Sequence, residues 1–306
     1  MAEAALHRPV MSGEVLEFLD PQPGWVVVDG TIGYAGHASE IARRIMPEGT
    51  LIGIDRDPRA LEHAAKELSR YGGSVKLHKA RFSELRAVLN ELDIAEVDGI
   101  LLDLGVSSPQ LDTAERGFSY MQPGPLDMRM DPEQPLSAAR VVNEYDRKRL
   151  TEVIGRYGEE RWASRIAAFI VKARERDPIT TTQQLVEVIK AAVPASARRK
   201  GGHPGRRTFQ ALRLEVNREL TELEEVLPDA VESLRPGGRM VVLTYHSLED
   251  RLVKRAFRAM AFPEAPAPAR VRLMTRRPRE ATESEVTDNP RSRSARLRAV
   301  EKMEEG

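Results

Sequence analysis

The segment from Trp25 to His37 (WVVVDGTIGYAGH) constrains the fold of this chain more than any other stretch. It starts with a run of valines and reaches Asp29, a pattern typical of a strand buried on both faces. Three glycines follow at a spacing of three, ahead of a predicted helix over 38–45. Glycines let a backbone approach a ligand closely, and a helix start supplies free N–H groups. The segment therefore predicts a nucleotide pocket, although a glycine turn after a strand is often only a turn.

A second strand strengthens the prediction of a nucleotide pocket. Residues 50–54 (TLIGI) are apolar and are followed by Asp55. An acidic residue that closes the second strand, roughly 20 residues past the glycines, suits a ribose diol. The glycine spacing differs from the dinucleotide pattern G-x-G-x-x-G. We therefore expect a nucleoside cofactor, with Asp29 accepting hydrogen bonds from its amine or ribose.

Two further strands, 75–79 and 98–104, complete an alternating α/β pattern. Phe82 lies in the turn after the first of them, and Asp103 lies near the end of the second. Ligands of open α/β sheets bind beyond the carboxyl ends of the strands. We therefore expect Asp29, Asp55, Phe82 and Asp103 to converge on one edge. Phe82 either stacks on an adenine or forms a hydrophobic plug beneath the next helix.

The alternating pattern stops after the fourth strand. Residues 111–135 are proline-rich and loop-like, and helical patterns follow without a strand signal. We expect a helical domain at 110–205 inserted into an α/β domain made of 1–109 and 206–306. The resumed α/β part is predicted as a helical stretch interrupted by Pro228, a fifth strand at 239–244, a helix capped by Ser247, and two terminal strands at 271–274 and 295–300.

Composition limits the class of protein. The chain has 306 residues, 41% of them hydrophobic, which is enough for a packed core. It has no cysteine, so a disulfide framework and a thiolate metal site are excluded, and we expect a cytoplasmic protein without a membrane span. The net charge is zero, but 190–220 carries eight Lys or Arg against two Glu. This patch suggests a local anionic partner, although most charge runs are solvated faces.

Several long runs resemble a known family. These runs are DGTIGYAGH (29–37), DGILLDLGVSSPQLDTAERGFSY (98–120), GPLDMRMD (124–131) and YHSLEDRLVKR (245–255). They are similar to the RsmH (MraW) family of ribosomal RNA small-subunit methyltransferases, within the Rossmann-like S-adenosylmethionine (SAM) methyltransferases. The resemblance implies a Rossmann-like sheet with an inserted all-helical domain that recognises the RNA. It also implies methylation of the exocyclic N4 of a cytidine in 16S rRNA, position 1402 in the usual rRNA numbering, near the decoding centre.

The resemblance also assigns cofactor contacts. With Asp29 and Gly33 from the strand and turn pattern, the expected SAM-binding residues are Asp29, Gly33, Ala35, Gly36, His37, Asp55, Phe82, Asp103 and Gln110. Ala35 departs from the family, which usually has glycine there. An alanine is tolerated if its φ is negative and strained if its φ is positive.

Methyl transfer to a cytosine amine needs in-line placement and acceptors for the N–H hydrogens, but no metal. The candidate catalytic residues are Asp103, with the backbone carbonyls that follow it, Ser107, Ser108 and His246. Each has a plainer alternative: the serines shape a turn, and His246 shapes a helix start.

The substrate and the class remain open to alternatives. The expected partner is 16S rRNA or the assembled small ribosomal subunit, and a homodimer is kept among the expected assemblies. A nicotinamide dehydrogenase would share the first two βα units, but the glycine spacing and the terminal strand pair argue against it. A non-catalytic RNA-binding protein with a relic cofactor fold is the other alternative, and the intact acidic residues argue against that.

Overall fold

The computed structural model describes residues 9–200 and 202–304, except for the side chains of Arg199 and Lys200. The chain forms two compact units. The sheet unit comprises Met1–Gly105 and Leu220–Gly306, and the helical unit comprises Val106–Glu219.

The sheet unit is built on eight strands in the order β3-β2-β1-β4-β5-β8-β6, with β7 paired to β8. The strands are β1 Val26–Asp29, β2 Thr50–Asp55, β3 Val75–Lys79, β4 Val97–Asp103, β5 Leu234–Thr244, β6 Val271–Leu273, β7 Arg279–Glu280 and β8 Arg296–Lys302. The first five strands are parallel, and β8 runs antiparallel to β5, β6 and β7. The Rossmann-like sheet predicted from the alternating pattern is confirmed.

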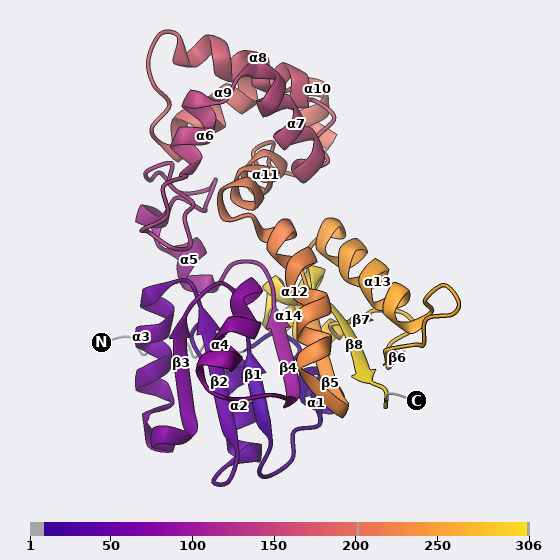
Figure 1. Cartoon of the computed structure of the whole chain (residues 1–306). Helices are drawn as coiled ribbons and strands as arrows, with labels where there is room; N and C mark the ends of the chain where they lie inside the picture. Colours follow the sequence, from indigo (N-terminus) through magenta and orange to yellow (C-terminus); the bar gives the residue numbers. More distant parts are fainter. Residues whose placement is uncertain (1–8, 201, 305–306) are drawn as a thin grey trace. The chain divides into compact units, whose positions relative to one another are not determined.

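Helices cover both faces of the sheet because neighbouring strand residues point in opposite directions. Val28 packs on one face with α4 (Leu85–Glu91), α12 (Glu219–Ser233) and α13 (Ser247–Ala261). Val27 packs on the other face with α1 (Ser12–Leu19), α2 (Gly36–Ile45) and α3 (Pro58–Glu67). This layering, followed in Figure 1, explains why the strands are continuous apolar runs. The unit is completed by η1 Ser69–Ser74, η2 Phe82–Glu84, α14 Glu283–Asp288 and η4 Pro290–Ser294.

The helical unit has its own hydrophobic core. Its helices are α5 Ser108–Asp112, η3 Ala114–Arg116, α6 Ala138–Glu144, α7 Arg147–Gly158, α8 Ala163–Arg174, α9 Thr182–Ala192, α10 Ala195–Lys200 and α11 Arg206–Asn217. Leu150, Ile166 and Leu185 of three successive helices are fully buried in this core. The stretch 111–135 was expected to be loop-like. It begins with the end of α5 and with η3, and only the part after these short helices is a loop.

The expected boundary at residue 205 differs from the structure. Helix α11 was placed in the α/β domain, but its Phe209, Leu212 and Val216 are buried in the core of the helical unit. The compact unit accordingly runs over 106–219 rather than 110–205. Pro228 was expected to interrupt the helix, yet it lies inside α12, and the break occurs at Arg218, whose φ is 51°. The apolar periodicity continues through α11 and α12. The sequence pattern therefore did not show that α11 packs in the core of the helical unit and α12 in the core of the sheet unit.

None of the helices in the described part of the chain is long and apolar enough to cross a bilayer.

Candidate functional site

Three carboxylates lie at the carboxyl ends of adjacent strands in the sheet unit. Asp29 ends β1, Asp55 ends β2 and Asp103 ends β4. Because β1 pairs with both β2 and β4 in parallel, the three strand ends share one edge. The structure therefore brings together the acidic residues that the sequence placed at this edge.

Asp55 ties the glycine turn to the end of β2. Its carboxylate accepts hydrogen bonds from the backbone N–H of Gly33 and of Asp57, both at 2.9 Å. The turn after β1 is thus fixed by a charged acceptor on the neighbouring strand. One carboxylate holding two backbone amides is well suited to orient its remaining lone pairs toward a ligand.

The amides of the glycine turn are largely used inside the turn itself. Thr31 N–H donates to Asp29 at 3.1 Å, and Ile32 N–H donates to the Ile54 carbonyl at 3.0 Å. Gly33 N–H goes to Asp55, and Ala35 N–H goes to the Ile32 carbonyl at 2.8 Å. These four donors are therefore not offered to a phosphate. Together with the acidic residues beside it, the turn suits a neutral or cationic nucleoside better than a pyrophosphate.

Ala35, which stands where the family usually has glycine, has the positive φ that was expected to strain an alanine. Its φ is 63° and its ψ is 24°, in the left-handed region, and it precedes α2 as the N-cap residue. An L-residue there costs about 1–2 kcal/mol. The methyl group is 1% exposed and packs in the core beneath the turn, so burial offsets part of that cost. The loop keeps the left-handed geometry for which glycine is the usual residue.

The electrostatics of this edge favour a cationic ligand. Burial is the main cause that raises the pKa of Asp29 to about 7; Asp103 and Asp55 also raise it, while His37 and the hydrogen bond from Thr31 lower it. Burial likewise raises the pKa of Asp55 to about 6, although the amides of Asp57 and Gly33 lower it. Carboxylates that crowd one another in a desolvated place are destabilised when ionised. A positive charge placed among them would relieve that repulsion.

His37 lies beside Asp103. Its side chain is 6% exposed, and its Nε2 is 3.4 Å from Asp103 Oδ2, too poorly aligned for a hydrogen bond. Both ring nitrogens are buried without a hydrogen-bond partner among the described residues. Buried polar atoms in this state are uncommon in folded proteins, so a polar ligand beside His37 would supply partners that the described residues lack.

Tyr245 was not singled out from the sequence, although it holds Asp103. Its hydroxyl donates to Asp103 Oδ1 at 2.7 Å, and burial followed by the Asp103 charge raises the pKa of the phenol well above its ordinary value. Asp103 N–H donates to Thr31 Oγ1 at 2.6 Å. The available signal was the register: Asp103 pairs with Leu243, so Tyr245 comes two residues later, directly after the end of the adjacent strand.

His246, rather than the expected Ser247, is the N-cap of α13. Its Nδ1 accepts from the Glu249 N–H at 3.4 Å, and Glu249 accepts in return from the N–H of His246 at 3.3 Å. His246 Nε2 lies 3.0 Å from Glu249 Oε1. The Nδ1 atom therefore caps the helix, as the plainer alternative expected, whereas Nε2 is buried without a hydrogen-bond partner among the described residues.

Phe82 is mostly buried in the sheet-unit core and is 8% exposed. The Arg56 guanidinium lies 5.6 Å from its ring centroid and forms a buried ion pair with Glu222. The contacts thus match the hydrophobic plug that was one of its two expected roles.

Ser107, Ser108 and Gln110 belong to the helical unit. Ser107 Oγ accepts from Gln110 N–H at 3.4 Å, and Gln110 Oε1 accepts from Ser107 N–H at 3.0 Å. This reciprocal cap starts α5, with Ser108 as its first residue. The turn-forming role weighed for the serines is therefore present in the structure.

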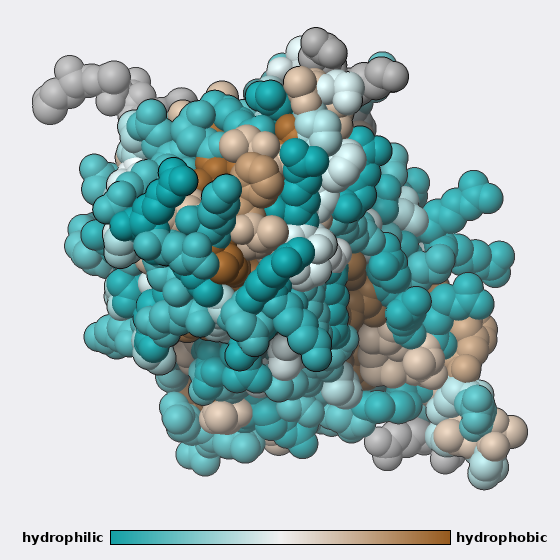
Figure 2. Space-filling view, turned by 90° about the horizontal axis from the view of Figure 1, so that it is seen from above, coloured by the Kyte–Doolittle hydropathy of each residue, from teal (hydrophilic) through white to brown (hydrophobic). Residues whose placement is uncertain are grey.

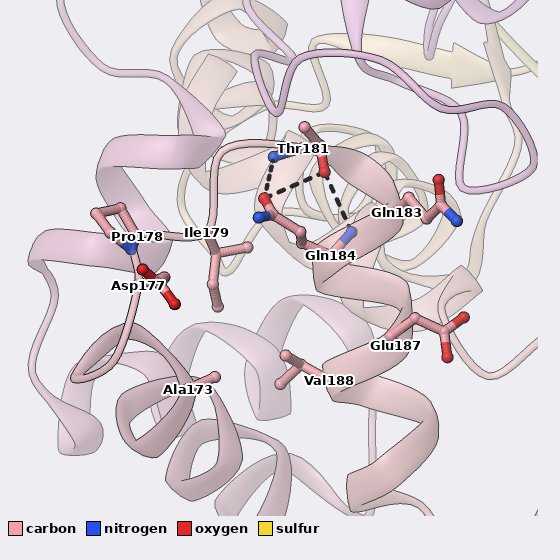
Figure 3. Close-up of a pocket in the computed structure, with 9 residues that line it drawn as sticks. All are labelled: Ala173, Asp177, Pro178, Ile179, Thr181, Gln183, Gln184, Glu187 and Val188. Carbon is pink, nitrogen blue, oxygen red and sulfur yellow. Dashed lines mark hydrogen bonds between the residues drawn. The ribbon is translucent and has the colours of Figure 1, made fainter.

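A cavity of about 420 Å³ lies elsewhere in the helical unit, between the end of α8 and the start of α9 (Figure 3). Its nine lining residues include Asp177 and Glu187 but no basic side chain. None of the predicted site residues lines it. Thr181 and Gln184, which Figure 3 shows joined by hydrogen bonds, cap α9.

The fold and the strand-end site define an α/β protein with a Rossmann-like sheet and an acidic site at its carboxyl edge, and comparison with known proteins identifies the family. The MraW methylase family model matches residues 4–303. The chain is 53% identical over 307 residues to ribosomal RNA small subunit methyltransferase H of Geobacter sulfurreducens, covering 97% of this chain and 99% of that protein. It is 51% identical over 313 residues to the protein of the same name from Symbiobacterium thermophilum, covering 98% of each. The chain belongs to the MraW methylase family.

Solved structures give weaker similarities. An rRNA methylase from Streptococcus thermophilus has a TM-score of 0.43 at 11% identity, over 98% of this chain and 100% of that one. A SAM-dependent O-methyltransferase from Thermotoga maritima has a TM-score of 0.45 at 10% identity, over 100% and 69%. Family membership makes the chain a methyltransferase that uses SAM as methyl donor.

Proposed function

We propose that this methyltransferase modifies the exocyclic N4 of a cytidine in 16S rRNA, at the position numbered 1402. The observation that carries this proposal is the near-full-length identity of about half the residues to relatives named for small-subunit rRNA methylation. The four long runs that resemble the same family point to the same nucleotide.

The strand-end site supports SAM rather than a dinucleotide as the ligand. SAM supplies a sulfonium methyl group, and it carries positive charges that suit the crowded carboxylates. We assign the ribose hydroxyls to Asp55, whose position at the end of β2 is the usual one for that contact. Asp29 and His37 interact electrostatically at the same place, and we assign the turn of Gly33, Ala35 and Gly36 to the cofactor as well.

We further assign Phe82 to the base of the cofactor and the Gln110 side chain to its polar atoms. A nicotinamide cofactor fits less well, because the turn amides are already bonded and the acidic residues repel a pyrophosphate. The intact carboxylates also argue against the other alternative, a non-catalytic RNA-binding protein with a relic cofactor fold.

The chemistry requires an acceptor for hydrogens of the cytosine amine, whose lone pair is delocalised into the ring. Asp103 is our first candidate, because it is 25% exposed and held by Tyr245 on one oxygen. The backbone carbonyls after it, with the hydroxyls of Ser107 and Ser108, are further acceptors. His246 is a further candidate: its Nδ1 caps α13, and its buried Nε2 has no hydrogen-bond partner among the described residues.

We assign RNA recognition to the helical unit. Arg198, Arg206 and Arg207 are exposed there and belong to the basic stretch predicted to contact phosphates. The other two members of that stretch, Arg199 and Lys200, have side chains outside the described residues. The enzyme would then act in the cytoplasm on 16S rRNA or on the assembled small subunit, and a homodimer is a separate proposal that size measurement in solution tests.

The decisive experiment is a methylation assay on small ribosomal subunits that lack the modification. Incubation with labelled SAM, followed by mapping of the labelled nucleotide, is expected to place the methyl group on N4 of the cytidine. Naked 16S rRNA in parallel distinguishes the two substrate forms. Label on another nucleotide, or on protein, would refute the assignment.

A further inference from the structure

An aromatic pair on the helical unit is not used by the strand-end site. The rings of Tyr120 and His203 stack with centroids 4.6 Å apart and an interplanar angle of 15°. Phe209 of α11 meets Tyr120 edge-on at 5.8 Å and is itself 3% exposed. The pair is thus anchored in the core on one side, while Tyr120 and His203 remain partly exposed.

The turn before α11 holds the His203 ring in place. Gly205 N–H donates to His203 Nδ1 at 3.2 Å, and a Cβ at Gly205 would lie 3.2 Å from that ring and 3.5 Å from Tyr120 Cβ. Burial, with Lys190 adding to it, lowers the pKa of His203 below its ordinary value. The imidazole is therefore neutral at pH 7, with Nδ1 accepting and the hydrogen on Nε2. A fixed, neutral, flat ring differs from the usual mobile surface histidine.

Positive charge surrounds this pair along the chain. Arg206 and Arg207, both exposed, are the first two residues of α11, whose first turn has no acidic residue and whose N-cap has no side-chain bond. Arg207 is partly occupied, since its guanidinium donates to the Glu159 carbonyl at 3.1 Å. Met121, which follows Tyr120 in the chain, is 72% exposed. An exposed apolar side chain and two exposed arginines thus lie close in sequence to the two stacked rings.

We infer that Tyr120 and His203 form a stacking platform for an unpaired base of the RNA substrate, with Arg206 and Arg207 holding the adjoining phosphates. This inference rests on the proposed RNA substrate and adds a contact outside the target cytidine. Proteins recognise single-stranded RNA by stacking splayed bases on aromatic side chains beside arginines. An RNA helix would offer no free base face to such a platform, so the ligand is an unpaired nucleotide.

Leucine and phenylalanine variants test the platform. Tyr120→Leu and His203→Leu each remove a ring, and we expect the KM for unmodified small subunits to rise about five- to hundredfold. The kcat at saturating RNA and the SAM affinity should stay near the wild-type values. Tyr120→Phe and His203→Phe retain a flat ring and should restore most of the affinity, which a purely polar contact would not allow.

The control is Phe262→Ala, which removes an aromatic ring that is 68% exposed in the sheet unit and should leave KM unchanged. Thermal unfolding of every variant separates lost contact from lost structure. If Tyr120→Leu unfolds, His203→Leu still tests the platform. His203 lies in the turn before α11, outside the helix itself, so its replacement should disturb the fold less. Leucine variants with wild-type KM would overturn the platform while the methylation assay still stands. If instead wild-type enzyme fails to methylate RNA, filter binding of the same subunits still tests the platform.

Discussion

The hydroxyl of Tyr245 donates a 2.7 Å hydrogen bond to Oδ1 of Asp103 across two adjacent parallel strands. Asp103 ends β4 and Tyr245 directly follows β5, so the bond joins the ends of the two strands nearest the proposed acceptor position. It fixes the carboxylate before any ligand is present.

Tyr245→Phe removes this donor and retains the ring. Hydrogen bonds to charged groups contribute about 1.5–3 kcal/mol, so we expect turnover to fall about ten- to hundredfold. The change should also lower the unfolding free energy, because Asp103 loses its donor, so turnover is compared at a temperature at which both proteins stay folded. Tyr71→Phe, a partly exposed tyrosine beside Arg70, is the matched control. Steady-state kinetics with wild-type values for Tyr245→Phe would show that Asp103 needs no such support.

Asp55→Ala tests the ribose assignment. Loss of a charge-assisted hydrogen bond should weaken SAM binding about ten- to a hundredfold, measured by calorimetry. Asp98→Asn is the control, because Asp98 lies near the opposite end of β4 and accepts from Val26 N–H at 2.7 Å. That variant should lose stability and keep its SAM affinity. An unchanged affinity in Asp55→Ala would remove Asp55 from the cofactor site.

Asp29 makes the stability of the ligand-free protein depend on pH. Its pKa is about 7 in the folded protein against an ordinary value of 3.8, so the folded state binds the proton more tightly. The unfolding free energy should therefore fall as pH rises from about 4 to 7. Asp29→Asn should reduce this slope, with Asp55 supplying the part that remains. Denaturant titrations at pH 4 and pH 7 measure the unfolding free energy of wild type and of Asp29→Asn. An equal change with pH in the two proteins would contradict the raised pKa of Asp29.

His246→Asn separates capping from catalysis. Asparagine is a good N-cap, so it should preserve the start of α13, whereas His246→Ala should lower the unfolding free energy by about 1 kcal/mol. From the observed contacts we expect the asparagine variant to keep most of its turnover and an unchanged pH profile. A strong loss of turnover in both variants, with SAM affinity intact, would instead assign His246 to the reaction.

Neutralising the basic stretch tests its contact with phosphates. Changing Arg198, Arg206 and Arg207 to glutamine should flatten the slope of log affinity against log salt by about 2 for single-stranded RNA. SAM affinity should not change. The same substitution of Arg43, Arg44 and Arg70 in the sheet unit controls for net charge. A slope equal to that of wild type would favour a solvated surface.

The sequence predicted the edge of the sheet on which the site forms. Buried parallel strands are continuous apolar runs, and the residue that ends each run must lie at the carboxyl edge. Asp29, Asp55 and Asp103 could therefore be placed together without coordinates. The long runs shared with the family then supplied the chemistry that strand patterns do not contain.

Other features depend on contacts between residues far apart in the chain. The sequence raised the question of φ at Ala35, and the packing of the turn against β2 made it positive. The bond between Tyr245 and Asp103 required the pairing of β4 with β5, and the capping role of His246 required the backbone direction at the start of α13.

The placement of α11 shows the same division most clearly. By itself the sequence determined an amphipathic helix at this place, because apolar residues at helical spacing need only a face to bury. It did not determine which core receives that face, since the burial free energy is the same against either set of apolar side chains. Only the tertiary structure decided that Phe209, Leu212 and Val216 pack in the helical unit.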